Sequence, residues 1–359
     1  MTSGPARSVA APEGRAGSAW LGWPLVGTGA VAAGLLAVVA ALLYGGGGPQ
    51  PALPGLSDPG AVTPWALPIA VALADGGAVV TAGLLLAAVV FVRSPGEHLA
   101  ATARWYLRAG GLAAAAWAAT AVVAAVFTVS DILGRPVSHL TGPGLLLQLT
   151  QSRALLLTAV LALAVTVASV WVQRRRPAAV VLVVAVVAVL PPAFTGHAAE
   201  AADHGTAVSS LVFHLAGVTV WAGGLVGLLT YASRRPGAGG GHERTVSPTA
   251  RRQELHAAAQ RFSGIALVCV GVVAVSGVVN AWVRLHSVAA VLGSPYGRLV
   301  LAKTAALVVL AAMGYRHRRS TLEPIARGRR GAFLRLATAE VLVMAATIGL
   351  AVGLSRTPI

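Results

Sequence analysis

The stretch TGHAAEAADHGTAVSSLVFHLAGVTVWAGGL, residues 195–225, joins a short polar loop to a long apolar segment. Five side chains in it are potential metal ligands: His197, Glu200, Asp203, His204 and His214. No other part of the sequence gathers so many such residues. The apolar run that follows the loop has the length of a membrane-spanning helix, which needs about 20 residues. The stretch therefore predicts a metal site at a membrane surface, held in place by the surrounding helices.

The composition of the whole chain is that of a membrane protein. Of its 359 residues, 56% are hydrophobic and only 11% are charged, whereas a soluble domain carries about 25% charged residues. The net charge of +16 comes from short basic clusters between apolar runs. This pattern is typical of loops that face anionic lipid. It lacks the polar face that a nucleic-acid-binding surface would need, so we expect the lipid bilayer as a partner and no nucleic acid.

Hydropathy predicts an all-α fold, a polytopic bundle of about nine transmembrane helices. The predicted spans are 21–44, 65–92, 105–129, 152–172, 178–194, 208–231, 262–285, 297–315 and 334–354. Gly, Pro or charged residues separate the runs. The fifth is short, and Pro191 and Pro192 are expected to end it just before the histidine loop.

The basic residues predict the orientation of the bundle. All but six of the 27 Lys and Arg residues fall on the side that carries the N-terminus. The six on the other side are Arg135, Arg153, Arg284, Arg298, Lys303 and Arg356. Because basic loops stay in the cytoplasm, we expect a cytoplasmic N-terminus. An odd number of spans then places the C-terminus outside, on the periplasmic or extracellular face of the cell membrane.

The chain divides into three parts under this topology. Residues 1–19 read as a disordered cytoplasmic tail, residues 20–194 as helices one to five, and residues 195–359 as the histidine loop and helices six to nine. The first apolar run exceeds the usual core of a signal peptide, which is about 7–15 residues. We therefore favour an uncleaved first helix over a signal peptide.

His214 is expected to face the helix bundle. It lies about six residues, or about 9 Å, inside the sixth predicted span, on one face with Gly217, Trp221 and Gly224. Glycines on one face let a neighbouring helix approach closely. Alone, His214 has an equally good interpretation as an imidazole hydrogen-bonded to another helix. His197 and His204 favour a metal site, because the three imidazoles can converge over a short distance.

Other polar residues inside the spans are candidates for a pathway or for a second shell around the metal, because such residues are costly in a membrane. Asp75 lies near the middle of the second span and serves either as a protonated hydrogen-bonding group or as a counter-charge. Asn280 shares a face with Gly277, and Tyr296 shares a face with Lys303. Lys303 either pairs with Asp75 or extends outward. Glu200, Asp203 and Trp221 complete the candidates.

The sequence also resembles a known family. FHLAGVTVWAGGL (213–225) resembles the His…Trp-x-Gly-Gly signature of the CopD copper-resistance membrane proteins. RFSGIALV and SGVVNAW within 261–282, followed by SPYGRLVLAK (294–303), resemble the later part of that family. The matching positions there are Phe262, Ser263, Gly277, Asn280, Tyr296, Gly297, Leu299 and Lys303. The resemblance covers about residues 195–320, which makes residues 195–359 a CopD-like half.

This resemblance implies copper handling on the outer side of the membrane, with a CopC-like periplasmic copper-binding protein as an expected partner. Some similar actinobacterial proteins continue into a domain like the oxidase assembly factor CtaG, which we do not expect here because the chain ends at Ile359. With only three methionines, a methionine ladder for Cu(I) is disfavoured, and imidazole and carboxylate ligands favour Cu(II). Whether the protein forms an oligomer is left open.

Three functions remain under consideration. The leading hypothesis is copper transport or copper delivery, with copper captured by His197, His204 and His214. A haem-binding membrane redox protein is the first alternative, since paired histidines hold b-type haems, although two clear pairs on facing helices are lacking. A partner that delivers copper to an oxidase without net transport is the second. No G-x-S-x-G or H-E-x-x-H motif occurs, and no Asp pair lies on facing spans, so we do not expect an enzyme.

Overall fold

The computed structural model describes residues 22–49, 57–94, 96–140, 142, 144–195, 204–234, 247–285, 287–320 and 330–358. The predicted cytoplasmic tail, residues 1–19, lies outside these ranges. The long helices are α1 (Gly22–Gly45), α2 (Thr63–Leu86), α3 (Ala101–Leu133), α5 (Thr150–Trp171), α6 (Arg175–Val187), α7 (His204–Ser233), α8 (Pro248–Leu285), α10 (Pro295–Ser320) and α12 (Arg330–Ser355). The short ones are the π-helical turn η1 (Ala87–Phe91), the 3-10 turns η2 (Val137–His139) and η3 (Pro191–Phe194), α4 (Leu145–Gln148) and α9 (Val288–Gly293). Within these ranges the β structure is a single isolated bridge between His98 and Arg174.

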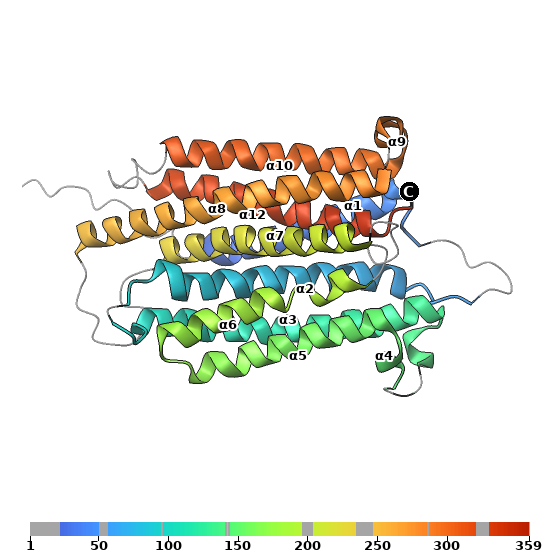
Figure 1. Ribbon diagram of the computed structural model, residues 1–359, viewed down its shortest axis with the longest axis horizontal. Helices are drawn as coiled ribbons and strands as arrows, with labels where there is room; N and C mark the ends of the chain where they lie inside the picture. The colour runs from blue at the N-terminus through green and yellow to red at the C-terminus, as the bar shows by residue number, and fades with distance from the viewer. Residues whose placement is uncertain are drawn as a thin grey trace, which may run out of the picture.

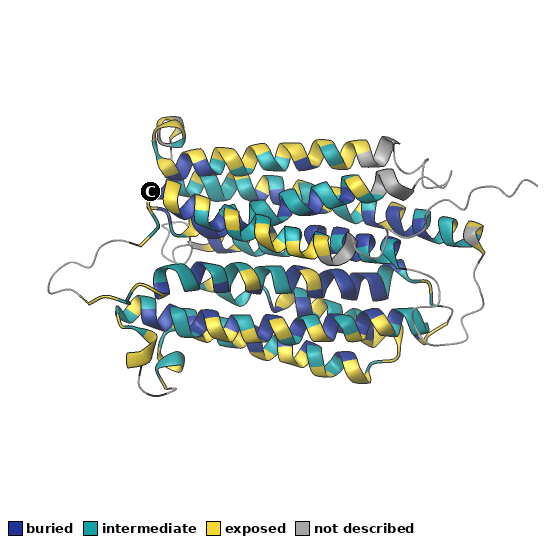
Figure 2. Ribbon diagram, turned by 180° about the vertical axis from the view of Figure 1, so that it is seen from behind, coloured by how far each residue is buried: buried dark blue, intermediate teal, exposed yellow. Residues whose placement is uncertain are grey.

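The predicted all-α bundle is confirmed. Nine helices of the described chain are long and apolar enough to cross a membrane, and they lie side by side along the long axis of the molecule (Figure 1). The outer faces of the bundle carry exposed residues along their whole length (Figure 2), among them large apolar ones such as Leu112, Val160 and Val268. Apolar side chains stay exposed along membrane-spanning helices because lipid, not water, surrounds them. The chain is a multi-pass membrane protein.

Most of the helices extend a few residues beyond the predicted spans, and two of these differences, both at polar helix starts, affect the site. Helix α8 begins at Pro248, well before the predicted start at residue 262, because its first turns are polar and carry no hydropathy signal. Helix α7 begins at His204, a residue that the sequence placed in the loop. The predicted end of the fifth span is confirmed, since α6 ends at Val187 and Pro191 opens the turn η3.

Glycines set the packing of α2 against α7 at the centre of the bundle. A Cβ atom on Gly83 would overlap the backbone of Gly223, and one on Gly227 would overlap the backbone of Gly83. Likewise, a Cβ on Gly223 would lie 2.7 Å from the carbonyl oxygen of Val79. The two backbones touch, as small residues permit between membrane helices. The predicted pair Gly223 and Gly227 therefore faces α2.

A different face of α7 packs against α8. A Cβ on Gly217 would lie 3.1 Å from the Val273 side chain, and one on Gly224 would overlap the ring of Phe262. This is the face that the sequence assigned to His214 and Trp221, and Trp221 is buried. Helix α7 is thus wedged between α2 and α8, and His214 lies on its α8 side.

The two chain ends of the described bundle lie at opposite ends of the molecule. Thr357, after α12, packs against Gly45 at the end of α1, so the start of α1 is at the far end. Arg356 forms a two-pronged ion pair with Asp131 at the end of α3, with N–O distances of 2.8 and 2.9 Å. This arrangement suits an odd number of crossings. Which end is cytoplasmic, and the division of the chain at residue 194, stay predictions.

Candidate functional site

His214 is the centre of the candidate site. It lies ten residues into α7, about 15 Å from the start of the helix, which is deeper than the sequence suggested because α7 begins earlier. Its side chain is only 7% exposed. Its Nδ1 atom lies 3.0 Å from the hydroxyl oxygen of Ser276 on α8. A histidine so placed is buried between two helices and faces away from lipid.

The hydrogen bonds around Ser276 determine which ring nitrogen of His214 is free. The Ser276 hydroxyl donates to the carbonyl of Val272, one turn earlier in α8, at 2.6 Å. A hydroxyl has one proton to donate, so toward His214 it accepts, and the donor is Nδ1–H. The lone pair of a neutral imidazole is then on Nε2. The ring also has a backbone hydrogen bond with Val273 on α8. With Nδ1–H bonded to Ser276, Nε2 is the nitrogen that carries the lone pair a metal would use.

A second serine, Ser210, links α7 to α8 by a hydrogen bond at the level of Ser276. Ser210, one turn before His214 on α7, donates its hydroxyl proton to the backbone carbonyl of Ser276 at 3.0 Å. Gly277 lies against the imidazole, since a Cβ there would be 3.7 Å from Cε1 of His214. Both contacts fix the position of the ring. A metal-binding histidine is normally oriented by a hydrogen bond from its other nitrogen in this way.

Further polar residues extend the site along α8 and α10. On α8, Ser276, Asn280 and Arg284 follow at intervals of four residues and so share one face. The guanidinium carbon of Arg284 lies 5.8 Å from the ring centre of Tyr296 on α10. Lys303, two turns further along α10, acts electrostatically on His214. We call His214, Ser276, Asn280, Arg284, Tyr296 and Lys303 the polar seam.

The register of the two helices explains the seam. Helices α8 and α10 are antiparallel neighbours joined through the short α9, so residues that follow Tyr296 on α10 meet residues that precede Arg284 on α8. Seven residues span about 10.5 Å in a helix. That step leads from Tyr296 to Lys303 and, in the other direction, from Arg284 to Gly277 beside His214. The predicted pathway residues Asn280, Tyr296 and Lys303 therefore lie along one interface with His214.

Asp75 lies at a different interface. On α2 it shares a face with Val79 and Gly83, four and eight residues later, and these contact α7. Its carboxylate forms no ion pair or hydrogen bond with any residue that the structure describes. Of the two alternatives for Lys303, pairing with Asp75 is not seen among the described residues, and its charge acts on His214, on the α8 side of α7. Asp75 and His214 thus flank α7 from opposite sides.

The remaining predicted ligands lie mostly outside the described residues. His197, Glu200 and Asp203 belong to the undescribed segment 196–203, and only the backbone of His204 is described, as the first residue of α7. No group of three His, Cys, Asp or Glu side chains that could hold a metal occurs in the ranges described above. Ten helical residues separate His204 from His214, about 15 Å. Metal–nitrogen bonds are about 2 Å long, so this spacing favours successive positions for the two imidazoles over one shared ion.

Sequence reasoning missed Ser276 and Ser210 as partners of His214. A signal for Ser276 was present, because it is the first residue of the SGVVN segment that resembled the family motif. In the structure, this segment supplies the hydrogen bond to the imidazole, the glycine beside the ring and the seam residue Asn280. Ser210 had no signal, since a serine in an apolar helix normally bonds to its own backbone.

Comparison with known proteins agrees with these motifs. Residues 256–354 match the family model of CopD, copper resistance protein D. The CopD region contains α8 from its third turn, α10 and most of α12, and therefore every residue of the polar seam except His214. It begins later and ends later than the predicted 195–320, and the His…Trp-x-Gly-Gly segment precedes it.

A curated relative is the copper transport protein CutJ of Bacillus subtilis (strain 168), 29% identical over 131 residues. The aligned part is 36% of this chain and 22% of that protein, so the chain spans about a fifth of the length of the relative it matches. No solved structure matches.

Proposed function

We propose that the protein moves or delivers copper at the cell membrane and that His214 receives the ion. The observation that carries the proposal is the buried imidazole of His214, oriented by Ser276 so that its lone pair is on Nε2, where α7 meets the CopD region. The CopD match and the name of the CutJ relative support a copper-related membrane function. They also favour a transporter over an enzyme.

Copper would enter at the end of the bundle where α7 begins. There His204 and the segment that carries His197, Glu200 and Asp203 supply imidazole and carboxylate groups, which suit Cu(II). His214 lies about 15 Å further along the same helix. Asn280 and Tyr296 lie between this end of the bundle and the level of His214, along α8 and α10, and offer oxygen atoms on the way to the imidazole. Asp75 on the other side of α7 serves as a counter-charge for the cation.

Lys303 acts on this path by repulsion. A charged ammonium has no lone pair, so it does not bind copper. Its charge lowers the affinity of the neighbouring imidazole for a cation. A transport site needs a limited affinity for its ion, because an ion that binds too tightly is not released.

The experiment measures copper uptake into membrane vesicles and copper binding by the purified protein. We expect His214→Ala to lose both, with Nε2 gone and the fold kept. His98→Ala is the matched control, because His98 is exposed at the opposite end of the bundle. Equal loss in the two variants would remove the reason for choosing His214. Uptake lost with binding retained would favour a pathway role over capture.

Two alternative functions, haem binding and copper delivery to an oxidase, can be distinguished from copper transport by experiment. A b-type haem held by paired histidines needs two of them on facing helices, and His214 is the single buried histidine among the residues that the structure describes. A Soret band in the purified protein would nevertheless establish haem. Delivery to an oxidase, with or without a CopC-like partner, predicts lost oxidase activity with unchanged cytoplasmic copper in a deletion strain. Net transport predicts a change in cytoplasmic copper.

A further inference from the structure

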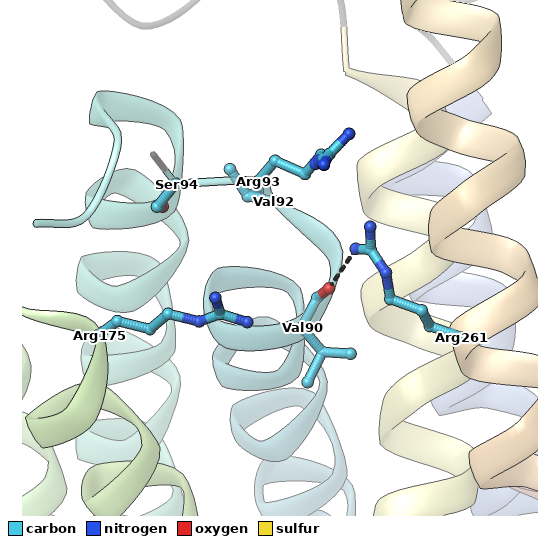
Figure 3. Close-up of a pocket in the computed structure, with 6 residues that line it drawn as sticks. All are labelled: Val90, Val92, Arg93, Ser94, Arg175 and Arg261. Carbon is cyan, nitrogen blue, oxygen red and sulfur yellow. Dashed lines mark hydrogen bonds between the residues drawn. The ribbon is translucent and has the colours of Figure 1, made fainter. Parts of the chain in front are cut away.

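A cavity of about 500 Å³ lies at the end of the bundle opposite His214. Its lining residues come from the end of α2, the start of α6 and the middle of α8: Val90, Val92, Arg93, Ser94, Arg175 and Arg261. Figure 3 shows Arg175 and Arg261 reaching toward Val90 from opposite sides, with Arg93 extending above them. Three arginines from three separate segments thus surround one space, and no carboxylate lines it.

The end of α2 creates this space. The helix closes in the π-helical turn η1, after which Val92 has an extended backbone. Here the Val92 N–H bonds back to the carbonyl of Ala87. The carbonyl of Val90 accepts a hydrogen bond from Nη1 of Arg261 at 2.7 Å. Arg261 is thereby fixed against α2.

The opposite wall is also well defined. The backbone N–H of Arg175 donates to the carbonyl of Glu97, and that of Leu99 donates to the carbonyl of Gln173, both at 2.9 Å. These bonds hold the start of α6 against the segment that follows α2. Backbone hydrogen bonds therefore fix both walls of the cavity.

The positive charge in the cavity is not neutralised. The guanidinium groups of Arg93 and Arg175 form no hydrogen bond or ion pair with the described residues. Glu97, the acidic residue next to this wall, is exposed and forms no ion pair with them. The three arginines are exposed, so solvent screens part of their mutual repulsion, but like charges held around one space still repel one another. An anion between the guanidinium groups would offset that repulsion.

The cavity lies at the boundary of the membrane-spanning region. Arg93 follows the span Thr63–Phe91 by two residues, and Arg175 is the first residue of the span Arg175–Phe194. This is the depth at which lipid phosphates lie, and the orientation predicted from the basic residues makes it the cytoplasmic face. Arg261 and Ser276 are 15 residues apart on α8, about 22 Å, so the cavity is separate from the polar seam.

We propose that this cavity binds a phosphate group, carried either by an anionic phospholipid or by a free phosphate compound. Arginine pairs with phosphate through two parallel hydrogen bonds, and the three guanidinium groups offer such donors from three directions. Ser94 accepts a hydrogen bond from the Ala100 N–H at 3.1 Å, and its hydroxyl proton is a further donor. The site is independent of copper binding at His214.

The test compares two probes on lipid-depleted protein in detergent. One arm titrates inorganic phosphate by calorimetry. The other adds dioleoylphosphatidylglycerol or dioleoylphosphatidylcholine and measures the lipid retained by mass spectrometry. The variant is Arg93→Gln with Arg175→Gln, which leaves the Arg261 hydrogen bond to Val90 intact. The control is Arg176→Gln, since Arg176 is exposed on the same helix and does not line the cavity.

We expect saturable binding in at least one arm, weakened at least tenfold in the double variant and unchanged in the control. Preference for phosphatidylglycerol over phosphatidylcholine, without phosphate binding, identifies a lipid site. Saturable phosphate binding identifies a soluble ligand. Absence of binding in both arms, or equal weakening by Arg176→Gln, would overturn the proposal. Should the double variant fail to fold, Arg93→Gln alone is expected to weaken binding. Copper binding should be unaffected throughout, which separates this site from the proposed function.

Discussion

The Nδ1 atom of His214 lies 3.0 Å from the Ser276 hydroxyl oxygen, and this hydroxyl donates its own proton to Val272. The two residues are 62 positions apart and belong to neighbouring helices. Ser276 therefore determines both the orientation of the ring and which nitrogen keeps its lone pair. The proposed binding of a metal at Nε2 would depend on this serine as well as on the histidine.

Replacement of Ser276 tests that dependence. Ser276→Ala should lower the copper affinity about tenfold to a hundredfold, the usual effect of losing the partner of a metal-binding histidine. Ser276→Thr should retain most of the affinity. Competition titration with a copper indicator measures the change. Ser233→Ala, which removes a hydroxyl bonded only to its own helix, should have no effect, and an unchanged affinity in Ser276→Ala would contradict the assigned role.

Removal of the charge of Lys303 should raise the copper affinity, the opposite of the effect expected for Ser276→Ala. Its ammonium acts on His214, so Lys303→Met should raise the copper affinity about tenfold, since one charge near another in a partly buried site contributes about 1–2 kcal/mol. Lys303→Arg should leave the affinity unchanged. Vesicle assays should show tighter binding but slower release. Weaker binding in Lys303→Met would indicate that Lys303 supports the site.

The backbone contact between α2 and α7 predicts an asymmetry between two glycines of one helix. Gly83→Ala should destabilise the bundle by about 1–3 kcal/mol, the usual cost of overpacking, because the added methyl group overlaps Gly223. Gly76→Ala should be neutral or stabilising, because nothing lies within 4 Å of the added Cβ and alanine favours helix. Thermal unfolding in detergent compares the two variants. Equal changes in stability for the two variants would mean that helix propensity, and not packing against α7, determines the effect of Gly83→Ala.

The ion pair between Asp131 and Arg356 should contribute little to stability. Both side chains are partly exposed, 26% and 29%, so Asp131→Asn should cost about 0.5–1 kcal/mol. A double-mutant cycle with Arg356→Gln, followed by thermal unfolding at low and high salt, isolates the pair. The coupling should shrink as salt rises, and a coupling that is insensitive to salt would argue against an exposed ion pair.

The predicted orientation can be measured by labelling of cysteines. In a Cys269→Ala background, Ser138→Cys and Glu97→Cys place exposed thiols at opposite ends of the bundle. A membrane-impermeant maleimide added to intact cells should label the first and spare the second. Labelling of Glu97→Cys alone would reverse the topology.

Sequence predicted the spans well because apolar length is a local property. The nine segments were all found, and the faces of α7 followed from the spacing of His214, Gly217 and Gly224. The polar start of α8 was missed because the helix continues beyond the apolar run.

What the sequence did not provide is which helices are neighbours. Periodicity places Lys303 on a face of α10 but does not say what that face meets. Charge alone left pairing with Asp75 open as one of two alternatives, whereas in the fold Asp75 lies on the α2 side of α7 and Lys303 acts on His214 on the α8 side. Ser210 gave no signal for the same reason, since its acceptor is a carbonyl 66 residues away.

The touching backbones of Gly83, Gly223 and Gly227 have a dynamic consequence. A contact made by backbone atoms alone has no side-chain rotamers to exchange. We therefore expect α2 and α7 to keep a fixed position relative to each other. Side chains such as Val273 and Phe262 fill the α7–α8 boundary and can repack. If the protein transports copper as proposed, we expect α8 and α10, and not α2 and α7, to move when the ion reaches the imidazole.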